Sequence, residues 1–164
     1  MSAPTRPTPV PTAFEIRDLF EGMLGREVTW DGDAARVDVL DGAAVATFVD
    51  DQGRLAALAL ADVPLIALAG SAIGLLPLAA AQKAIAEDLV TPVQFENMGE
   101  ILNVMASVLN KHDTPHLRLR ETYSPRETLP ADVASLALVQ GGRIDGALTI
   151  QGYGTGRISM VVDL

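Results

Sequence analysis

Glu100 and Asn103 are the residues whose types and spacing best suit chemistry in this chain. They lie within ENMGEILNVMASVLN, residues 96–110, three positions apart and therefore about one helical turn from each other. A carboxylate pairs with cations, and an amide both donates and accepts hydrogen bonds. Because an amide does not titrate near neutral pH, Asn103 cannot act as a general base, but it can position a water molecule or hold a polar partner.

This stretch has helical periodicity and two unlike faces. At about 100° per residue, one broad side is apolar and is predicted to be core: Met98, Ile101, Leu102, Met105, Val108 and Leu109. The opposite stripe contains no Lys or Arg and consists of Glu96, Glu100, Asn103, Ser107 and Asn110. A solvated face is the plain alternative. A stripe selected only for solubility would, however, favour Lys, Arg, Glu and Gln over Asn, Ser and Gly, which are poor helix formers.

Two small residues, Gly99 and Ala106, lie on the shoulder of this polar stripe. Small side chains allow another protein to approach a helix backbone closely. We therefore predict that the Glu100 and Asn103 pair lies within a partner-binding surface formed by Glu96, Gly99, Ala106, Ser107 and Asn110.

The helices that position this pair have recognisable ends. Thr91-Pro92-Val93-Gln94 has the form of a capping box with Pro at the first helical position, so a long helix is expected to run from Pro92 to about His112. An earlier helix is predicted over residues 12–24, ending at Gly25. The Ala-rich residues 63–89 predict one or two helices, broken near Gly74 and Pro77.

The remaining segments favour an antiparallel sheet. Alternating or β-branched runs between Asp-Gly turns predict a meander of strands near residues 28–30, 35–40, 43–51 and 54–62. After the long helix we expect a strand, a short helix or turn, and a final hairpin, at residues 116–123, 130–136 and 143–164. Asp41-Gly42-Ala43 is echoed by Asp145-Gly146-Ala147, which indicates either chance or two helix-plus-hairpin halves sharing one sheet.

Composition limits the classes of function. The 164 residues fit a flexible Pro-rich tail, residues 1–12, followed by a single domain, residues 13–164. A net charge of −9 argues against a nucleic-acid partner, and the absence of Cys excludes disulfides and thiol chemistry and suits a cytoplasmic protein. The uncharged residues 63–81 are the best candidate for a membrane span, but their Pro and Gly residues favour short buried helices, so no span is predicted.

No metal site is predicted. His112 and His116 are four residues apart, but Pro115 interrupts the helix that would align them. Asp50 and Asp51 suit a hairpin turn better than a calcium loop, and the Gly-rich residues 152–156 lack the following helix that a phosphate loop requires.

The segment around the Glu-x-x-Asn pair resembles a family signature. Glu100-Ile101-Leu102-Asn103, preceded by Glu96 and followed by Pro125, is similar to the motif of the CheC/CheX chemotaxis phosphatases: Asp or Ser, three residues, Glu, two residues, Asn, about twenty-two residues and Pro. The resemblance implies a pseudo-symmetric α+β fold, with long helices packed on an antiparallel sheet. It also implies one active helix, as in CheX, because Leu24 occupies the place of the second Asn in the first helix.

The resemblance further implies a reaction and a partner. The substrate would be the phospho-aspartate of a CheY-like response-regulator receiver domain. Asn103 would orient the attacking water, and Glu100 would pair with the receiver's lysine. The divalent metal would belong to the receiver, so this chain would need no cofactor of its own, and a CheX-like homodimer is expected.

Two departures from the signature keep alternatives open. Glu96 stands where the family has Asp or Ser, and Pro125 falls one residue short of the usual spacing. The chain is therefore interpreted as a phosphatase or, alternatively, as a non-catalytic module that docks on a receiver, on a flagellar switch protein or on itself. An unrelated small α+β domain with an accidental motif is the third interpretation.

Overall fold

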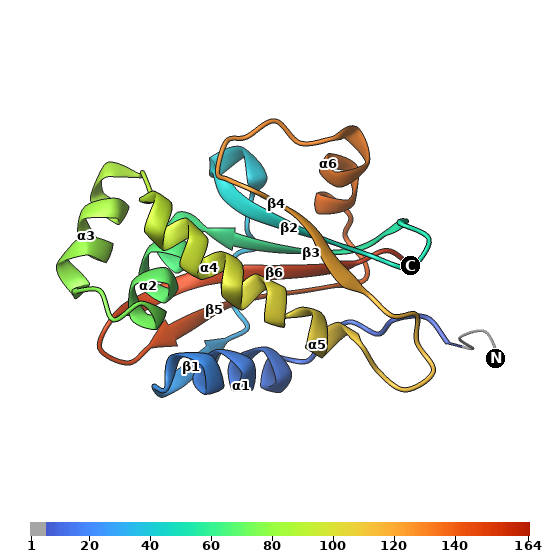
Figure 1. Ribbon diagram of the computed structural model, residues 1–164, viewed down its shortest axis with the longest axis horizontal. Coiled ribbons are helices and arrows are strands. Elements are labelled where there is room, and N and C mark those ends of the chain that lie inside the picture. The colour runs from blue at the N-terminus through green and yellow to red at the C-terminus, as the bar shows by residue number, and fades with distance from the viewer. Residues whose placement is uncertain (1–5) are drawn as a thin grey trace.

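The computed structural model describes residues 6–164, which form one six-stranded antiparallel sheet with helices on both faces (Figure 1). The strands are β1 Val28–Asp31, β2 Ala43–Val49, β3 Leu55–Asp62, β4 Arg118–Tyr123, β5 Arg143–Ile150 and β6 Gly154–Val162. The helices are α1 Ala13–Leu24, α2 Val63–Ile73, α3 Leu78–Glu87, α4 Pro92–Val104, α5 Ala106–Leu109, α6 Ala131–Ala137 and the short 3-10 helix η1 Val39–Asp41.

The sheet is built from two equivalent halves. Its strand order is β1-β5-β6-β3-β2-β4. If β1, β2 and β3 are exchanged with β4, β5 and β6, respectively, the same order is obtained in reverse. Each half supplies a helix, a strand and a hairpin, and each lone strand pairs with the hairpin of the other half. The predicted pseudo-symmetric α+β fold is confirmed. The sequence echo itself is out of register, because Gly42 precedes β2 whereas Gly146 lies inside β5.

Small residues let α2 lie close to the sheet. The side of β2 and β3 that faces the helices is lined by alanines: Ala44, Ala46, Ala57, Ala59 and Ala61. On β6, a Cβ added at Gly156 would stand 2.4 Å from the Cα of Leu65. Residues 63–89 thus form two short helices, as predicted, and α2 is a buried core element. Among residues 6–164, no helix combines the length and apolar composition needed to cross a bilayer.

The helices begin at the caps that the sequence indicated. Thr12 caps α1 and Thr91 caps α4, each in a reciprocal capping box with the residue three positions later, Glu15 and Gln94. Gly25 ends α1 in the left-handed conformation, at φ 64°, which a residue without a Cβ adopts at little cost. These local signals therefore fix where the two long helices start and where the first one ends.

The predicted strand over residues 35–40 is wrong. The Val37 N–H donates to the Ser159 hydroxyl at 3.0 Å, and the Asp38 carboxylate accepts from the Leu40 N–H at 2.9 Å, which folds the chain into η1. The backbone of this segment is satisfied by side chains rather than by a neighbouring strand. The predicted meander also fails at β1, which pairs with β5 instead of with β2.

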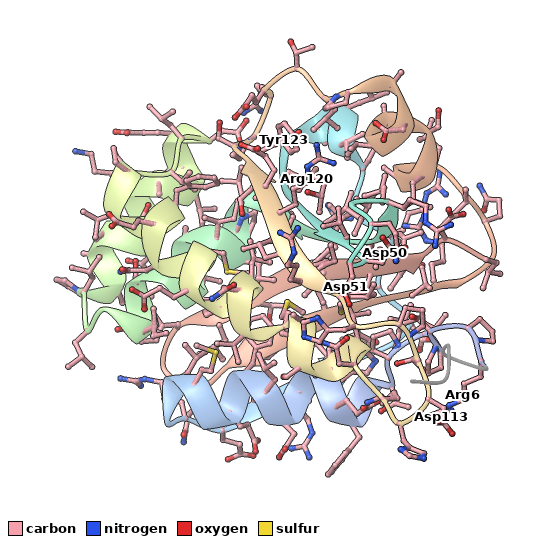
Figure 2. All side chains as sticks on the ribbon, turned by 45° about the vertical axis from the view of Figure 1, so that its right-hand side comes forward. Arg6, Asp50, Asp51, Asp113, Arg120 and Tyr123 are labelled. Carbon is pink, nitrogen blue, oxygen red and sulfur yellow. The ribbon has the colours of Figure 1, made fainter. Side chains whose placement is uncertain are left out.

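The N-terminal segment that the structure describes is packed against the domain. Residues 1–5 lie outside the described part of the chain. Thr8 is buried, and Val10 packs against the core. Figure 2 shows Arg6 beside Asp113, and the Arg6 Nε donates to the His112 carbonyl at 2.7 Å. From residue 6 onward, this segment therefore packs along the domain, while the flexibility of the tail stays a prediction.

A polar cluster joins the 35–40 segment to β5 and β6. The Arg143 guanidinium and the Ser159 hydroxyl both donate to the Asp145 carboxylate, the latter at 2.6 Å. Burial alone raises the pKa of Asp145, but the hydrogen bonds from Arg143 and Ser159 outweigh it and hold the pKa below its ordinary value. Asp145 thus stabilises the fold in its charged form.

We expect the cluster to make the protein sensitive to acid. A carboxyl whose pKa is lowered on folding contributes stability that is complete above its ordinary pKa of about 4 and is lost as the pH falls through the lowered value. Asp145→Asn should therefore lower the urea midpoint at pH 7 and reduce the further fall between pH 5 and pH 3. Asp33→Asn, in an exposed turn, is the control and should keep the wild-type pH dependence. An unchanged acid-induced fall in Asp145→Asn would contradict this role.

Candidate functional site

Buried amides fix the rotation of α4. The Gln94 side chain is fully buried, and its Nε2 donates at 3.2 Å to the Ser71 hydroxyl and to the Ala80 carbonyl. One turn later, the Asn97 Nδ2 donates to the Gly70 carbonyl at 2.8 Å. These bonds tie α4 to α2 and α3, so the helix can present only one face to solvent.

That face carries the predicted polar stripe. Glu96, Glu100, Asn103 and Ser107 are all exposed, and every residue of the predicted apolar side is buried. Within residues 6–164, the Glu100 and Asn103 side chains form no hydrogen bond or ion pair. Both groups are therefore free to interact with a partner or with water.

The shoulder of the stripe is open as well. Gly99 and Ala106 are half-buried, and a Cβ added at Gly99 would have no atom within 4 Å. Packing inside this chain thus does not require a glycine at position 99. The site is a convex helix surface with a carboxylate and an amide one turn apart, and a partner can approach its backbone directly.

The long helix is shorter than predicted. Helical hydrogen bonding is interrupted at Met105, α5 ends at Leu109, and Asn110 adopts an extended conformation. The Asn110 Nδ2 donates to the Leu117 carbonyl at 2.9 Å, and its Oδ1 accepts from the Leu117 N–H at 2.7 Å. Asn110 therefore closes the loop before β4, and its amide is occupied rather than available to a partner as the sequence suggested.

The first helix does not present a second pair. Leu24, at the place of a second Asn, is only 8% exposed. The Glu21 carboxylate accepts at 3.0 Å from the Arg17 guanidinium and at 3.0 Å from the Val28 N–H. Glu21 thus joins α1 to β1, and α4 is the one of the two related helices that carries an exposed Glu-x-x-Asn pair.

Pro125 lies near the start of α4. With Phe95 and Thr91 it lines a cavity of about 400 Å³ at the beginning of this helix. Phe95 precedes Asn103 by eight residues, or about two turns, so Pro125 bounds the opposite end of the helix from the Asn.

The other sequence candidates have structural explanations. His112 and His116 pair with different acids, Asp113 at 3.3 Å and Asp51 at 3.7 Å. In the described part of the chain, no three His, Cys, Asp or Glu side chains are grouped so that they could hold a metal ion. Residues 151–153 form the tight turn between β5 and β6, as expected for a hairpin.

Comparison with solved structures relates the fold to that of FliM. Neither a protein-family model nor a curated protein sequence matches the chain. FliM in the FliG-FliM complex from H. pylori matches with a TM-score of 0.58 and 8% identity, covering 90% of this chain and 84% of that chain. The FliM middle domain from Vibrio alginolyticus matches with a TM-score of 0.55 and 9% identity, covering 92% and 88%.

A CheX structure is also similar. CheX from Borrelia burgdorferi, in a complex with CheY, BeF3 and Mg2+, matches with a TM-score of 0.48 and 8% identity, covering 91% of this chain and 93% of that chain. The chain therefore has the fold of the FliM middle domain, the α+β architecture that its resemblance to CheC and CheX predicts.

Proposed function

We propose that this protein binds the phosphorylated receiver domain of a CheY-like response regulator and hydrolyses its phospho-aspartate. The proposal rests on the exposure of Glu100 and Asn103, which stand one turn apart on α4 with no partners in the described chain. Gln94 and Asn97 on the same helix are, by contrast, hydrogen-bonded within the chain. The exposure of the Glu100 and Asn103 pair, together with the resemblance of its segment to the CheC/CheX signature, supports a role toward another molecule.

The chemistry requires positioning rather than a titrating base. Asn103 would accept a hydrogen bond from a water molecule and hold that molecule in line with the scissile bond. As the water oxygen bonds to phosphorus, the bond from phosphorus to the aspartate oxygen breaks, giving inorganic phosphate and a free carboxylate. Glu100 would pair with the receiver's lysine and set the register of the complex. The divalent metal that neutralises the phosphoryl charge would be the receiver's, so this chain would need no cofactor.

The proposal also gives the protein a setting. A partner of response regulators would work in the cytoplasm, as the lack of Cys also suggested.

The predicted CheX-like homodimer stays a prediction. β4 is an edge strand of the sheet, with β2 as its only partner strand in the described chain, so it has an edge at which a second copy could pair.

A non-catalytic docking module is the second candidate. Glu96 stands where the family signature has Asp or Ser, and the structural neighbours with the higher TM-scores are FliM domains, one of them in a complex with FliG. These observations favour a protein that keeps the fold and docks on a receiver or on a switch protein without hydrolysing phosphate. The same face of α4 would then bind without reacting.

One assay separates the two candidates. Receiver domains from the same genome are phosphorylated with a small phosphodonor, and the loss of phosphate is followed with and without this protein, alongside a binding measurement by fluorescence anisotropy. Faster loss with at least one receiver supports the phosphatase. Binding without acceleration supports the docking module, and neither binding nor acceleration with any receiver rejects both.

A further inference from the structure

A groove lies beside the proposed site and is lined by residues of α1 and of the end of α4. These two segments lie side by side in Figure 1. The groove has a volume of about 400 Å³, and its walls include Phe14, Asp18 and Gly22 of α1 and Val104 and Ser107 of α4 and α5. Val104 directly follows Asn103, and Ser107 lies one turn further on. A partner that covers Asn103 would therefore lie over the groove as well.

The groove is apolar and acidic. Phe14 is 65% exposed and Val104 is 43% exposed, although large apolar side chains are usually buried. Asp18 has no ion-pair partner within residues 6–164, and no Lys or Arg lines the groove. Glu15 also lines the groove, but its carboxylate is already paired with Lys111. The surface thus offers an apolar cleft beside one free negative charge.

We infer that this groove is a second contact for the same receiver domain, taking an apolar side chain that a Lys or Arg of the receiver flanks. The inference rests on the proposed function for the identity of the partner. The volume of the groove lies near the lower end of the range for ligand pockets, about 300–1,000 Å³, and suits one or two side chains rather than a whole ligand. A Lys or Arg is expected beside that apolar side chain because Asp18 lies in the groove and the adjacent polar stripe contributes two more acidic residues, Glu96 and Glu100. A second copy of this chain is the alternative occupant, which the measurement of self-association distinguishes.

Gly22 provides a way to fill the groove without damaging the fold. It is an exposed helical residue, and a Cβ added to it would have no atom within 4 Å. Gly22→Leu projects a side chain into the groove, whereas Gln82→Leu, at an exposed position of α3 outside the groove, is the matched control. Leu is a good helix former, so neither substitution should unfold its helix. Asp18→Asn tests the charge alone.

The test measures the affinity of each variant for a receiver activated with beryllofluoride and Mg2+, together with the KM and kcat for phospho-receiver. Gly22→Leu is expected to weaken binding and raise KM at least about tenfold with kcat unchanged, while Gln82→Leu stays within about twofold of the wild type. Asp18→Asn should weaken binding and reduce its dependence on salt.

Equal affinity of Gly22→Leu and Gln82→Leu would overturn the inference, as would an effect of Gly22→Leu on self-association without one on receiver binding. Failure of the proposed hydrolysis would give a different result from failure of the groove inference. If no receiver is dephosphorylated but Gly22→Leu still loses binding, the groove is a docking site and the catalytic role is wrong. If no receiver binds the wild-type protein, the groove inference fails together with the proposed function.

Discussion

Replacing Asn103 by Ala is expected to slow receiver dephosphorylation by about 100-fold or more while leaving the fold intact. The Asn103 side chain is exposed and forms no hydrogen bond within residues 6–164, so its removal breaks no internal hydrogen bond. Ala is also the better helix former, by several tenths of a kcal/mol. A group that orients the attacking water acts mainly on the reacting complex, so kcat should fall much more than the affinity for the receiver.

Single-turnover loss of phosphate from the receiver, with this protein in excess, measures the effect directly. Gln82→Ala is the matched control because Gln82 is an exposed helical residue on α3, and removing its amide should leave the rate within about twofold. Urea denaturation should show that Asn103→Ala is at least as stable as the wild type. A rate equal to that of Gln82→Ala would remove Asn103 from the mechanism and favour the docking module.

Local signals predicted the helices well because their determinants are close in sequence. The capping boxes at Thr12 and Thr91 involve residues three positions apart, and Gly25 ends α1 through its own backbone conformation. The two faces of α4 follow from the spacing of its apolar residues. For this reason the exposure of Glu100 and Asn103 could be predicted without knowing what packs on the other side.

Long-range partners explain most of the errors. Val37 looked like part of a strand because Val37 and Val39 alternate with polar residues, yet its N–H is taken by Ser159, which lies 122 residues later. β1 pairs with β5 across a similar separation, and nothing in its four residues identifies that partner. Alternation indicates that a segment is extended and half-buried, but it does not identify the group that satisfies the backbone.

Sequence patterns also fail to identify the partners of single amide side chains at the site. Asn103 and Asn110 belong to the same polar stripe and are chemically identical, but the second is held by both backbone groups of Leu117. Gln94 was recognised as part of a capping box, whereas its burial against Ser71 and Ala80 was not predicted. A periodic pattern locates a face of a helix, and only the packing of the other elements decides which amides on that helix remain free.

Replacing Gly70 by Ala is expected to destabilise the protein by about 1–3 kcal/mol in the free energy of unfolding. Gly70 lies in α2 where this helix crosses α4, and an added Cβ would stand 2.3 Å from the Gln94 carbonyl oxygen and 3.0 Å from the Gln94 Cα. These atoms are backbone, so a rotamer change cannot relieve the overlap and the two helices must separate. The same separation would strain the bond from the Asn97 amide to the Gly70 carbonyl.

Gly99→Ala is the matched control for this substitution. Both changes replace a helical Gly by Ala and gain up to about 1 kcal/mol of helix propensity, but position 99 faces open space. Urea denaturation should therefore show Gly99→Ala as stable as the wild type or more so, and Gly70→Ala clearly less stable, so that the difference isolates the helix crossing. Equal stabilities of the two variants would show that the crossing of α2 and α4 accommodates the added methyl group. Because the crossing sets the rotation of α4, folded Gly70→Ala should also dephosphorylate receivers more slowly, although Glu100 and Asn103 are both present.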